Sequence, residues 1–191
     1  MSAEAVYKPF MEGERLALRP LLPDDVGEEY SRWMNDPEVT EFLESRFWPA
    51  SPEQLRAYVA QMTKNPQVVF FAVIEKETGK HVGNVKLGPI DWIHRFGDMG
   101  ILIGDKSKWG KGYATETILL MTRYAFEKLN LHKVTASCYG NNLGSIRAFQ
   151  KAGYEEEGRR KSQCFSQGRY VDLVCLGMIH PAGKETEKRD A

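Results

Sequence analysis

The segment from Asp98 to Leu129 constrains the fold of this chain more than any other part of the sequence. An apolar run from Met99 to Gly104 predicts a strand, and a short polar turn and two glycines follow it. Apolar residues then recur at spacings of three or four, which predicts a helix with one buried face: Ala114, Ile118, Met121, Ala125 and Leu129. The sequence therefore predicts a strand, a glycine-rich loop and a helix in this order.

A glycine-rich loop that leads into a helix is typical of an anion-binding site. The first N–H groups of a helix have no partner within the helix, and the helix dipole favours negative charge there. Gly110 and Gly112 carry no Cβ, so phosphate oxygens can approach the main chain closely. The spacing is neither that of the Walker loop nor that of the dinucleotide-binding fingerprint. We expect the helix to open at Trp109 and a phosphate group to bind at its start.

The loop resembles the pyrophosphate loop of the GNAT superfamily of N-acetyltransferases, whose pattern is Arg/Gln-x-x-Gly-x-Gly/Ala. Trp109 stands at the first position of that pattern, Gly112 at the fourth and Ala114 at the sixth. A tryptophan departs from the commonest pattern and is similar to the branch that includes ribosomal-protein N-terminal acetyltransferases. The resemblance implies acetyl-CoA as co-substrate, bound by the loop residues Trp109, Gly110, Lys111, Gly112, Tyr113, Ala114 and Thr115.

Two more segments carry the same resemblance. Asn142 to Ser145, followed by Phe149 and a Lys-Ala-Gly-Tyr sequence, is similar to the family's Asn-x-x-Ser/Ala helix. The resemblance implies that Asn142 and Phe149 lie beside the pantetheine arm of the cofactor, and Asn142 is also a good N-cap. It further implies that the central strand pairs its main chain with the pantetheine amides, as an added strand would, at Ile101, Leu102 and Ile103.

The remaining patterns predict an α+β protein, and the resemblance implies the GNAT fold, a mixed and mostly antiparallel sheet flanked by helices. We expect one domain over residues 1–181 and a disordered tail over 182–191. Expected strands are 16–20, 68–74, 81–87, 134–138, 154–160 and 170–178. Expected helices are 24–34, 51–63 and 142–153, with a helical turn at 38–43 and loops at 44–50 and 89–96.

Composition argues against several classes of partner. The chain has 26 basic and 26 acidic residues, so its charge favours neither nucleic acid nor an anionic membrane. Its three cysteines have no metal or disulfide spacing, which fits a reducing cytoplasm. No signal peptide and no apolar run long enough to span a bilayer is found. We expect a cytoplasmic protein without a bound metal, and we keep a homodimer as an assembly to examine.

The resemblance implies direct attack of a neutral amine on the acetyl thioester, which requires a base and a proton donor. Many family members place a tyrosine donor where this chain has Phe149, and Ser145 stands where the ribosomal branch places a donor hydroxyl. A serine at a helix start can equally bond the backbone. Asp98 is the candidate base, although an acid at a strand end can simply be solvated. His94 is the nearby group that titrates near neutral pH.

The acceptor pocket is expected to include the loop residues Arg46, Trp48, Trp92 and His94. The segments 35–39, 44–47 and 83–90 look like those of members that act on amino sugars, so we expect a small amine acceptor such as a nucleotide-linked amino sugar. The N-terminal α-amine of a ribosomal or other protein is the alternative. A GNAT fold that binds acyl-CoA without catalysis is a further alternative, which the missing tyrosine favours.

Overall fold

The computed structural model describes residues 9–181, so the tail predicted to be disordered lies outside the described residues. The helices are α1 (Glu28–Asn35), α2 (Pro52–Lys64), α3 (Tyr113–Glu127) and α4 (Leu143–Lys151). The strands are β1 (Met11–Glu12), β2 (Leu16–Pro20), β3 (Val69–Glu75), β4 (His81–Asp91), β5 (Phe96–Ile103), β6 (Lys133–Tyr139), β7 (Glu155–Ser166) and β8 (Arg169–Ile179). None of these helices is long and apolar enough to cross a bilayer.

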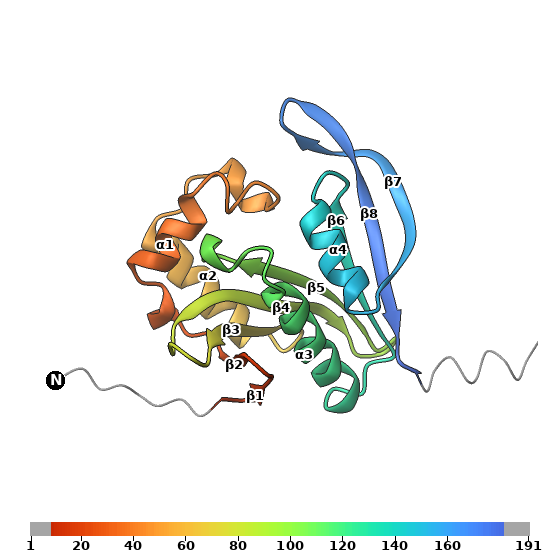
Figure 1. Ribbon diagram of the computed structural model, residues 1–191, viewed down its shortest axis with the longest axis horizontal. Helices are drawn as coiled ribbons and strands as arrows, with labels where there is room; N and C mark the ends of the chain where they lie inside the picture. Colours follow the sequence, from red (N-terminus) through yellow and green to blue (C-terminus); the bar gives the residue numbers. More distant parts are fainter. Residues whose placement is uncertain (1–8, 182–191) are drawn as a thin grey trace, which may run out of the picture.

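The strands form one sheet in the order β1-β2-β3-β4-β5-β6-β8-β7 (Figure 1). Among the described strands, β5 and β6 are parallel neighbours, and the other neighbouring pairs are antiparallel. This arrangement confirms the predicted mixed, mostly antiparallel sheet flanked by helices.

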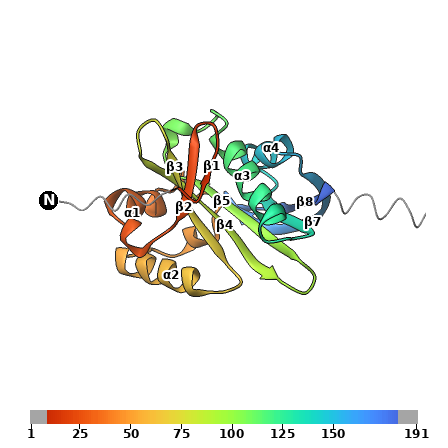
Figure 2. The same cartoon turned by 90° about the horizontal axis from the view of Figure 1, so that it is seen from below.

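Helices cover both faces of the sheet, α1 and α2 on one side and α3 and α4 on the other (Figure 2). Successive residues of a strand point to opposite faces, so β3 contributes to both cores. Phe71 and Val73 pack with α3, whereas Ala72 packs with α1 and α2. This double burial explains why the β3 segment has a continuous apolar sequence rather than an alternating one.

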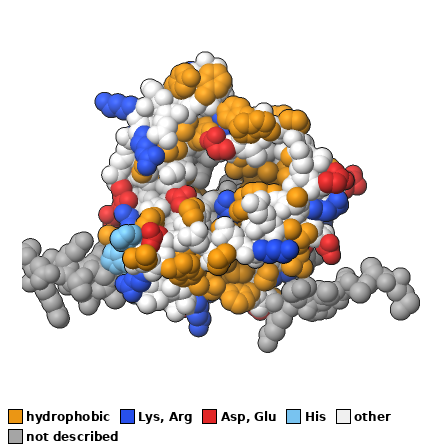
Figure 3. Space-filling model, turned by 180° about the vertical axis from the view of Figure 1, so that it is seen from behind, with side chains coloured by type: hydrophobic (Ala, Val, Ile, Leu, Met, Phe, Trp, Pro, Cys, Tyr) orange, Lys and Arg blue, Asp and Glu red, His pale blue; other side chains and the backbone are white. Residues whose placement is uncertain are grey.

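The two parallel strands separate after a short paired stretch. β5 pairs with β6 only from Phe96, opposite Lys133, to Asp98, opposite Thr135. Beyond that point β5 stays paired with β4 as far as Ile103, while β6 stays paired with β8 as far as Tyr139. We call the opening between them the fork. Figure 3 shows the molecule hollowed near the centre of one face.

Several details differ from the sequence prediction, and one is the start of α1, which is predicted at residue 24 but lies at Glu28, after a separate 3₁₀ turn at Pro23–Asp25. The predicted loop at 89–96 is wrong, because β4 continues to Asp91 and a short turn leads directly into β5. A proline cannot donate to a sheet ladder, and here the register shifts between Leu87 and Ile90, so the strand passes Pro89 at an irregular position. The sequence cannot show this shift because it depends on the pairing with β5.

Two further differences concern the start of α3 and the position of a helical turn. The predicted helix opening at Trp109 is wrong, since Gly110 and Gly112 have φ values of 71° and 84° and α3 begins only at Tyr113. The predicted helical turn at 38–43 is wrong as well. Asp36 accepts a bond from the N–H of Glu38 through its side chain, which favours a turn over a helix, and the 3₁₀ turn lies at Glu44–Phe47.

Candidate active site

The N-terminus of α3 lacks a side-chain cap. Ser51 caps α2 and Asn142 caps α4 through their side chains, but the N-cap of α3 is Gly112. The N–H groups of Gly112, Tyr113, Ala114 and Thr115 therefore find no acceptor within the described part of the chain. A cradle of N–H groups at the positive end of a 15-residue helix is suited to an anion such as a pyrophosphate.

The remaining loop residues differ in what they offer to a ligand. Gly110 and Lys111 are exposed, and the ammonium of Lys111 has no ion-pair partner within residues 9–181. The indole Nε1 of Trp109 instead donates to the carbonyl oxygen of Ile103 at 2.7 Å, so this side chain turns back towards the end of β5. Trp109 thus links the loop to the fork.

The main chain of β5 faces the fork at alternate residues. The N–H of Gly104 donates to the carbonyl of Val82 in β4, and hydrogen-bonded pairs alternate along an antiparallel ladder. Leu102 therefore directs its main-chain groups towards β4, while Ile101 and Ile103 direct theirs towards the fork. This corrects the expectation that all three residues face the cofactor.

Asp98 lies where the fork opens, on the face of the sheet that α1 and α2 cover. Its carboxylate accepts a bond of 2.9 Å from the hydroxyl of Thr135, and the side chain is half-buried. Burial raises the pKa of Asp98, and the Thr135 bond and the nearby Lys86 oppose that rise in part. A raised pKa makes the ionised carboxylate a stronger proton acceptor than an exposed aspartate.

Ser145 lies at the same fork but on the opposite face. Its N–H is capped by the Asn142 side chain at 3.1 Å, and its hydroxyl lies 3.3 Å from the thiol of Cys138 in β6. Cys138 belongs to the core that α3 and α4 cover, and burial raises its pKa. Asp98 and Ser145 therefore flank the fork from its two sides.

Phe149 is only 1% exposed, and its ring packs edge-on against Tyr154 at 5.0 Å. The hydroxyl of Tyr154 hydrogen-bonds to Thr122. The position at which many relatives carry a tyrosine donor is therefore filled by an apolar ring that forms part of the core.

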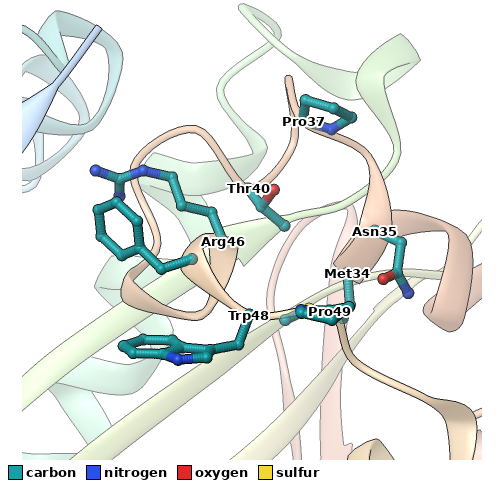
Figure 4. Close-up of a pocket in the computed structure, with 8 residues that line it drawn as sticks. Met34, Asn35, Pro37, Thr40, Arg46, Trp48 and Pro49 are labelled. Carbon is teal, nitrogen blue, oxygen red and sulfur yellow. The ribbon is translucent and has the colours of Figure 1, made fainter. Parts of the chain in front are cut away.

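A cavity of about 390 Å³ lies under the segment between α1 and α2. We call residues 36–48 the strap. In Figure 4, Arg46 and Trp48 lie on one side of the cavity, with Asn35 and Pro37 on the other. Trp48 is 68% exposed, so a large aromatic surface faces this opening.

Arg46 is largely occupied by the protein itself. Its guanidinium donates to the Phe165 carbonyl at 2.6 Å and to the Tyr139 hydroxyl at 3.1 Å, and it stacks on the rings of Phe47 and Tyr139. The Tyr139 hydroxyl in turn donates to Glu44. Arg46 thus ties the strap to the end of β6 and to the β7–β8 hairpin.

The predicted acceptor residues do not all come together. Trp92 and His94 lie in the turn between β4 and β5, at the end of β5 opposite to the strap (Figure 1). The indole of Trp92 donates to the carbonyl of Pro66, and the N–H of His94 donates to Asp91. Arg46 and Trp48 line the same cavity, whereas Trp92 and His94 do not line it.

Several residues of the opening were not found from the sequence. Thr135 and Tyr139 belong to the alternate set of β6 that faces away from α3 and α4. The alternation of Val134, Ala136 and Cys138 indicates the buried face of this strand. The residues at the alternate positions, Thr135 and Tyr139, must then point to the opposite face, and this signal could have identified them. Lys86, which donates to the hydroxyl of Tyr58 at 3.0 Å, gave no such signal.

Comparisons with known proteins agree with one another. A family model described as acetyltransferase (GNAT) domain matches residues 15–155. The SPbeta prophage-derived uncharacterized N-acetyltransferase YokL of Bacillus subtilis is 30% identical over 170 residues, covering 88% of this chain and 92% of that protein. The spermidine N(1)-acetyltransferase of Vibrio cholerae is 33% identical over 101 residues, covering 53% and 58% of the two chains.

The solved structures give the same picture. A crystal structure of spermidine N-acetyltransferase from Vibrio cholerae, in complex with CoA and spermine, superposes with a TM-score of 0.79. The sequence identity is 25%, and the match covers 87% of this chain and 96% of that one.

Proposed function

The chain belongs to the GNAT family of acetyltransferases, and from this premise we propose that its acceptor is a small amine that carries additional positive charge. The protein is an acetyl-CoA-dependent N-acetyltransferase. Beyond this activity, we propose the chemical class of the acceptor and the roles of individual residues.

The uncapped start of α3 supports a place for the pyrophosphate, on the N–H groups from Gly112 to Thr115. The pantetheine arm then lies in the fork, where the main-chain groups of Ile101 and Ile103 lack a strand partner. The side-chain oxygen of Asn142 is engaged by Ser145, which leaves the amide Nδ2 as a donor to the pantetheine. On this proposal the cofactor takes the position of a strand between β5 and β6.

The positions of Asp98 and Ser145 on opposite faces of the fork support separate roles for them, as proton acceptor and proton donor. The amine approaches from the side of Asp98, whose carboxylate receives a proton through water as the nitrogen attacks the thioester carbon. The C–S bond then breaks, and Ser145 passes a proton to the departing thiolate from the other side while its own hydroxyl takes a proton from solvent water. The N–H of Ile101, directed into the fork, is in a position to stabilise the developing oxyanion.

The charge of the strap is the observation that carries the choice of acceptor. It contains four carboxylates, on Asp36, Glu38, Glu41 and Glu44, and one guanidinium, on Arg46. Lys106 pairs with Asp36 and Glu38, which still leaves the strap as a whole with an excess of negative charge, although Arg46 is the charged residue among those that line the cavity. The exposed ring of Trp48 adds a surface that attracts cations.

This charge weighs against one of the sequence expectations. A nucleotide-linked amino sugar carries phosphate groups that the strap repels, whereas a diamine or polyamine carries a second cation that the strap attracts. An alkylamine with a pKa near that of lysine is neutral in roughly one molecule in 2,500 at pH 7, so such an acceptor needs the base more than a sugar amine does.

A panel of acceptors tests the proposal. With acetyl-CoA and thiol release as readout, we expect kcat/KM for spermidine to exceed that for glucosamine, a nucleotide-linked amino sugar or an N-terminal peptide by about tenfold or more. Added salt should raise KM for spermidine and leave KM for glucosamine nearly constant, because screening weakens attraction between charges. Faster turnover of the sugar nucleotide or the peptide would contradict the proposed acceptor.

Ser145→Ala tests the proton donor. General acid catalysis contributes about 10²–10⁴-fold, and a thiolate leaves readily, so we expect kcat to fall by about 10²-fold with unchanged binding of acetyl-CoA. Ser31→Ala is a matched control, because Ser31 is a helix serine whose hydroxyl donates to the Gly27 carbonyl of its own helix start. A Ser145→Ala enzyme with wild-type kcat, measured where chemistry limits the rate, assigns the serine a structural role.

A further inference from the structure

Two carboxylates from outside the loop hold the segment from Lys108 to Tyr113 in place. We propose that Glu75 and Glu116 are positioning residues for acetyl-CoA, which fix this loop in its anion-binding shape without touching the ligand. The inference rests on the proposed pyrophosphate site at the start of α3. It adds two residues that neither the loop motif nor the cavity indicates.

Glu116 forms the first of these attachments. Its Oε1 accepts the N–H groups of Arg15 and Leu16 at 2.8 and 3.0 Å, and its Oε2 accepts Nε of Arg15 at 3.0 Å. The same guanidinium donates to the carbonyl of Lys111 at 2.8 Å. The carboxylate thus orients Arg15 at the beginning of β2, and Arg15 holds the middle of the loop.

Glu75 at the end of β3 forms the second attachment. Its carboxylate accepts Nζ of Lys108 at 2.5 Å, the Thr78 hydroxyl at 2.7 Å and the hydroxyl of Tyr113. The side chain is 3% exposed, and the Lys108, Thr78 and Tyr113 bonds lower the pKa of Glu75 to about 2. Glu75 is therefore ionised at any physiological pH, and it holds the loop on both sides of its two glycines.

The loop needs such attachments because of its own sequence. Gly110 and Gly112 both adopt left-handed conformations, and glycine has the largest choice of alternative conformations in the free chain. The ring of Tyr113 lies 4.9 Å from the guanidinium carbon of Arg15 and 5.6 Å from Nζ of Lys108. Both attachments therefore meet at the first residue of α3, whose N–H is part of the anion cradle.

If Glu75 and Glu116 acted on acetyl-CoA through their charge alone, their removal would strengthen binding rather than weaken it. A carboxylate beside an anion site repels the ligand, and Glu75 also engages an ammonium that a phosphate would attract. Removal of that charge should then tighten binding. Positioning predicts weaker binding, since the loop must be ordered at the moment the ligand binds. The sign of the change therefore separates the two explanations.

The test measures acetyl-CoA binding by calorimetry and KM and kcat by thiol release in Glu75→Gln. We expect a rise of about tenfold in Kd and in KM for acetyl-CoA, with kcat and the acceptor KM within about twofold of wild type. Amide hydrogen exchange at residues 110–115 of the free protein should become faster. Glu75→Asp should recover part of the affinity, and Tyr113→Phe, which removes one bond only, should weaken binding by about threefold.

Asp25→Asn is the matched control. Asp25 also accepts two bonds from an arginine, Arg19, and one from a backbone N–H, but it lies before α1 and away from the loop. This variant should leave Kd unchanged. Unchanged or tighter binding in folded Glu75→Gln overturns the inference. A wild-type protein that binds no acetyl-CoA refutes the proposed site instead, and the exchange rates still decide whether the carboxylates hold the loop.

Discussion

Replacement of Gly112 by valine is expected to lower the affinity for acetyl-CoA by about two to four orders of magnitude. The residue has a φ of 84°, a conformation that a β-branched side chain adopts only at high cost, and an added Cβ would lie 3.2 Å from the Arg15 side chain. The chain must shift, and it then loses charge-assisted bonds to the pyrophosphate worth about 1.5–3 kcal/mol each. Two such bonds account for the expected range.

Gly79→Val separates the loss of binding from general backbone strain. Gly79 lies in the turn between β3 and β4 with a φ of 68°, and nothing lies within 4 Å of a Cβ there. Both variants should lose thermal stability to a similar degree, but only Gly112→Val should lose affinity in calorimetry. A folded Gly112→Val protein that binds acetyl-CoA like wild type would show that the N–H groups at the start of α3 do not hold the pyrophosphate.

Asp98→Asn is expected to reduce kcat/KM for the amine by about 10²–10⁴-fold, because that is the usual contribution of a positioned base. In the wild type, activity should rise with pH through the raised pKa of Asp98, and this acidic limb should be absent from the variant. Asp91→Asn, at the end of β4 where the turn into β5 begins, should behave like wild type. Equal activity and an unchanged pH profile in Asp98→Asn would exclude the carboxylate as the base.

Asp98→Asn is expected to lower activity but to preserve or raise the stability of the protein. A carboxyl whose pKa is raised by folding stabilises the native state fully below its unfolded value of 3.8, and that contribution is lost as pH rises through the folded pKa. At pH 7 the buried charge of Asp98 therefore opposes folding. Asp98→Asn keeps an acceptor for Thr135 and removes the charge, so its melting temperature should equal or exceed that of the wild type.

Local signals in the sequence identified those parts of the site that depend on local structure. Asn142 caps its helix as predicted, and Ser51 caps the helix predicted to start at residue 51, since a cap needs only a side chain and the turn that follows it. The glycines at 110 and 112 marked the loop for the same reason. Their left-handed conformations, after which α3 begins at Tyr113, lie beside bonds to Arg15 and Glu75, which are far away in the sequence and which local signals do not reveal.

Residues whose role depends on tertiary contacts were harder to predict. Arg46 looked like a ligand for the acceptor, yet it bonds to Tyr139 and Phe165, which come from strands about 90 and 120 residues later. The burial of Asp98 depends on the pairing of β5 with β6, and the proximity of Ser145 to Cys138 depends on how α4 packs. A single sequence carries no local trace of such contacts.

The fork also has a mechanical consequence. Main-chain bonds between β5 and β6 join the two halves of the sheet over three residue pairs, so this seam is the part of the sheet with the least backbone pairing per length of strand. A ligand that hydrogen-bonds to both β5 and β6 would add main-chain bonds across this seam. If the cofactor binds in the fork as proposed, the sheet should therefore resist shear along this seam more strongly with the cofactor bound than without it.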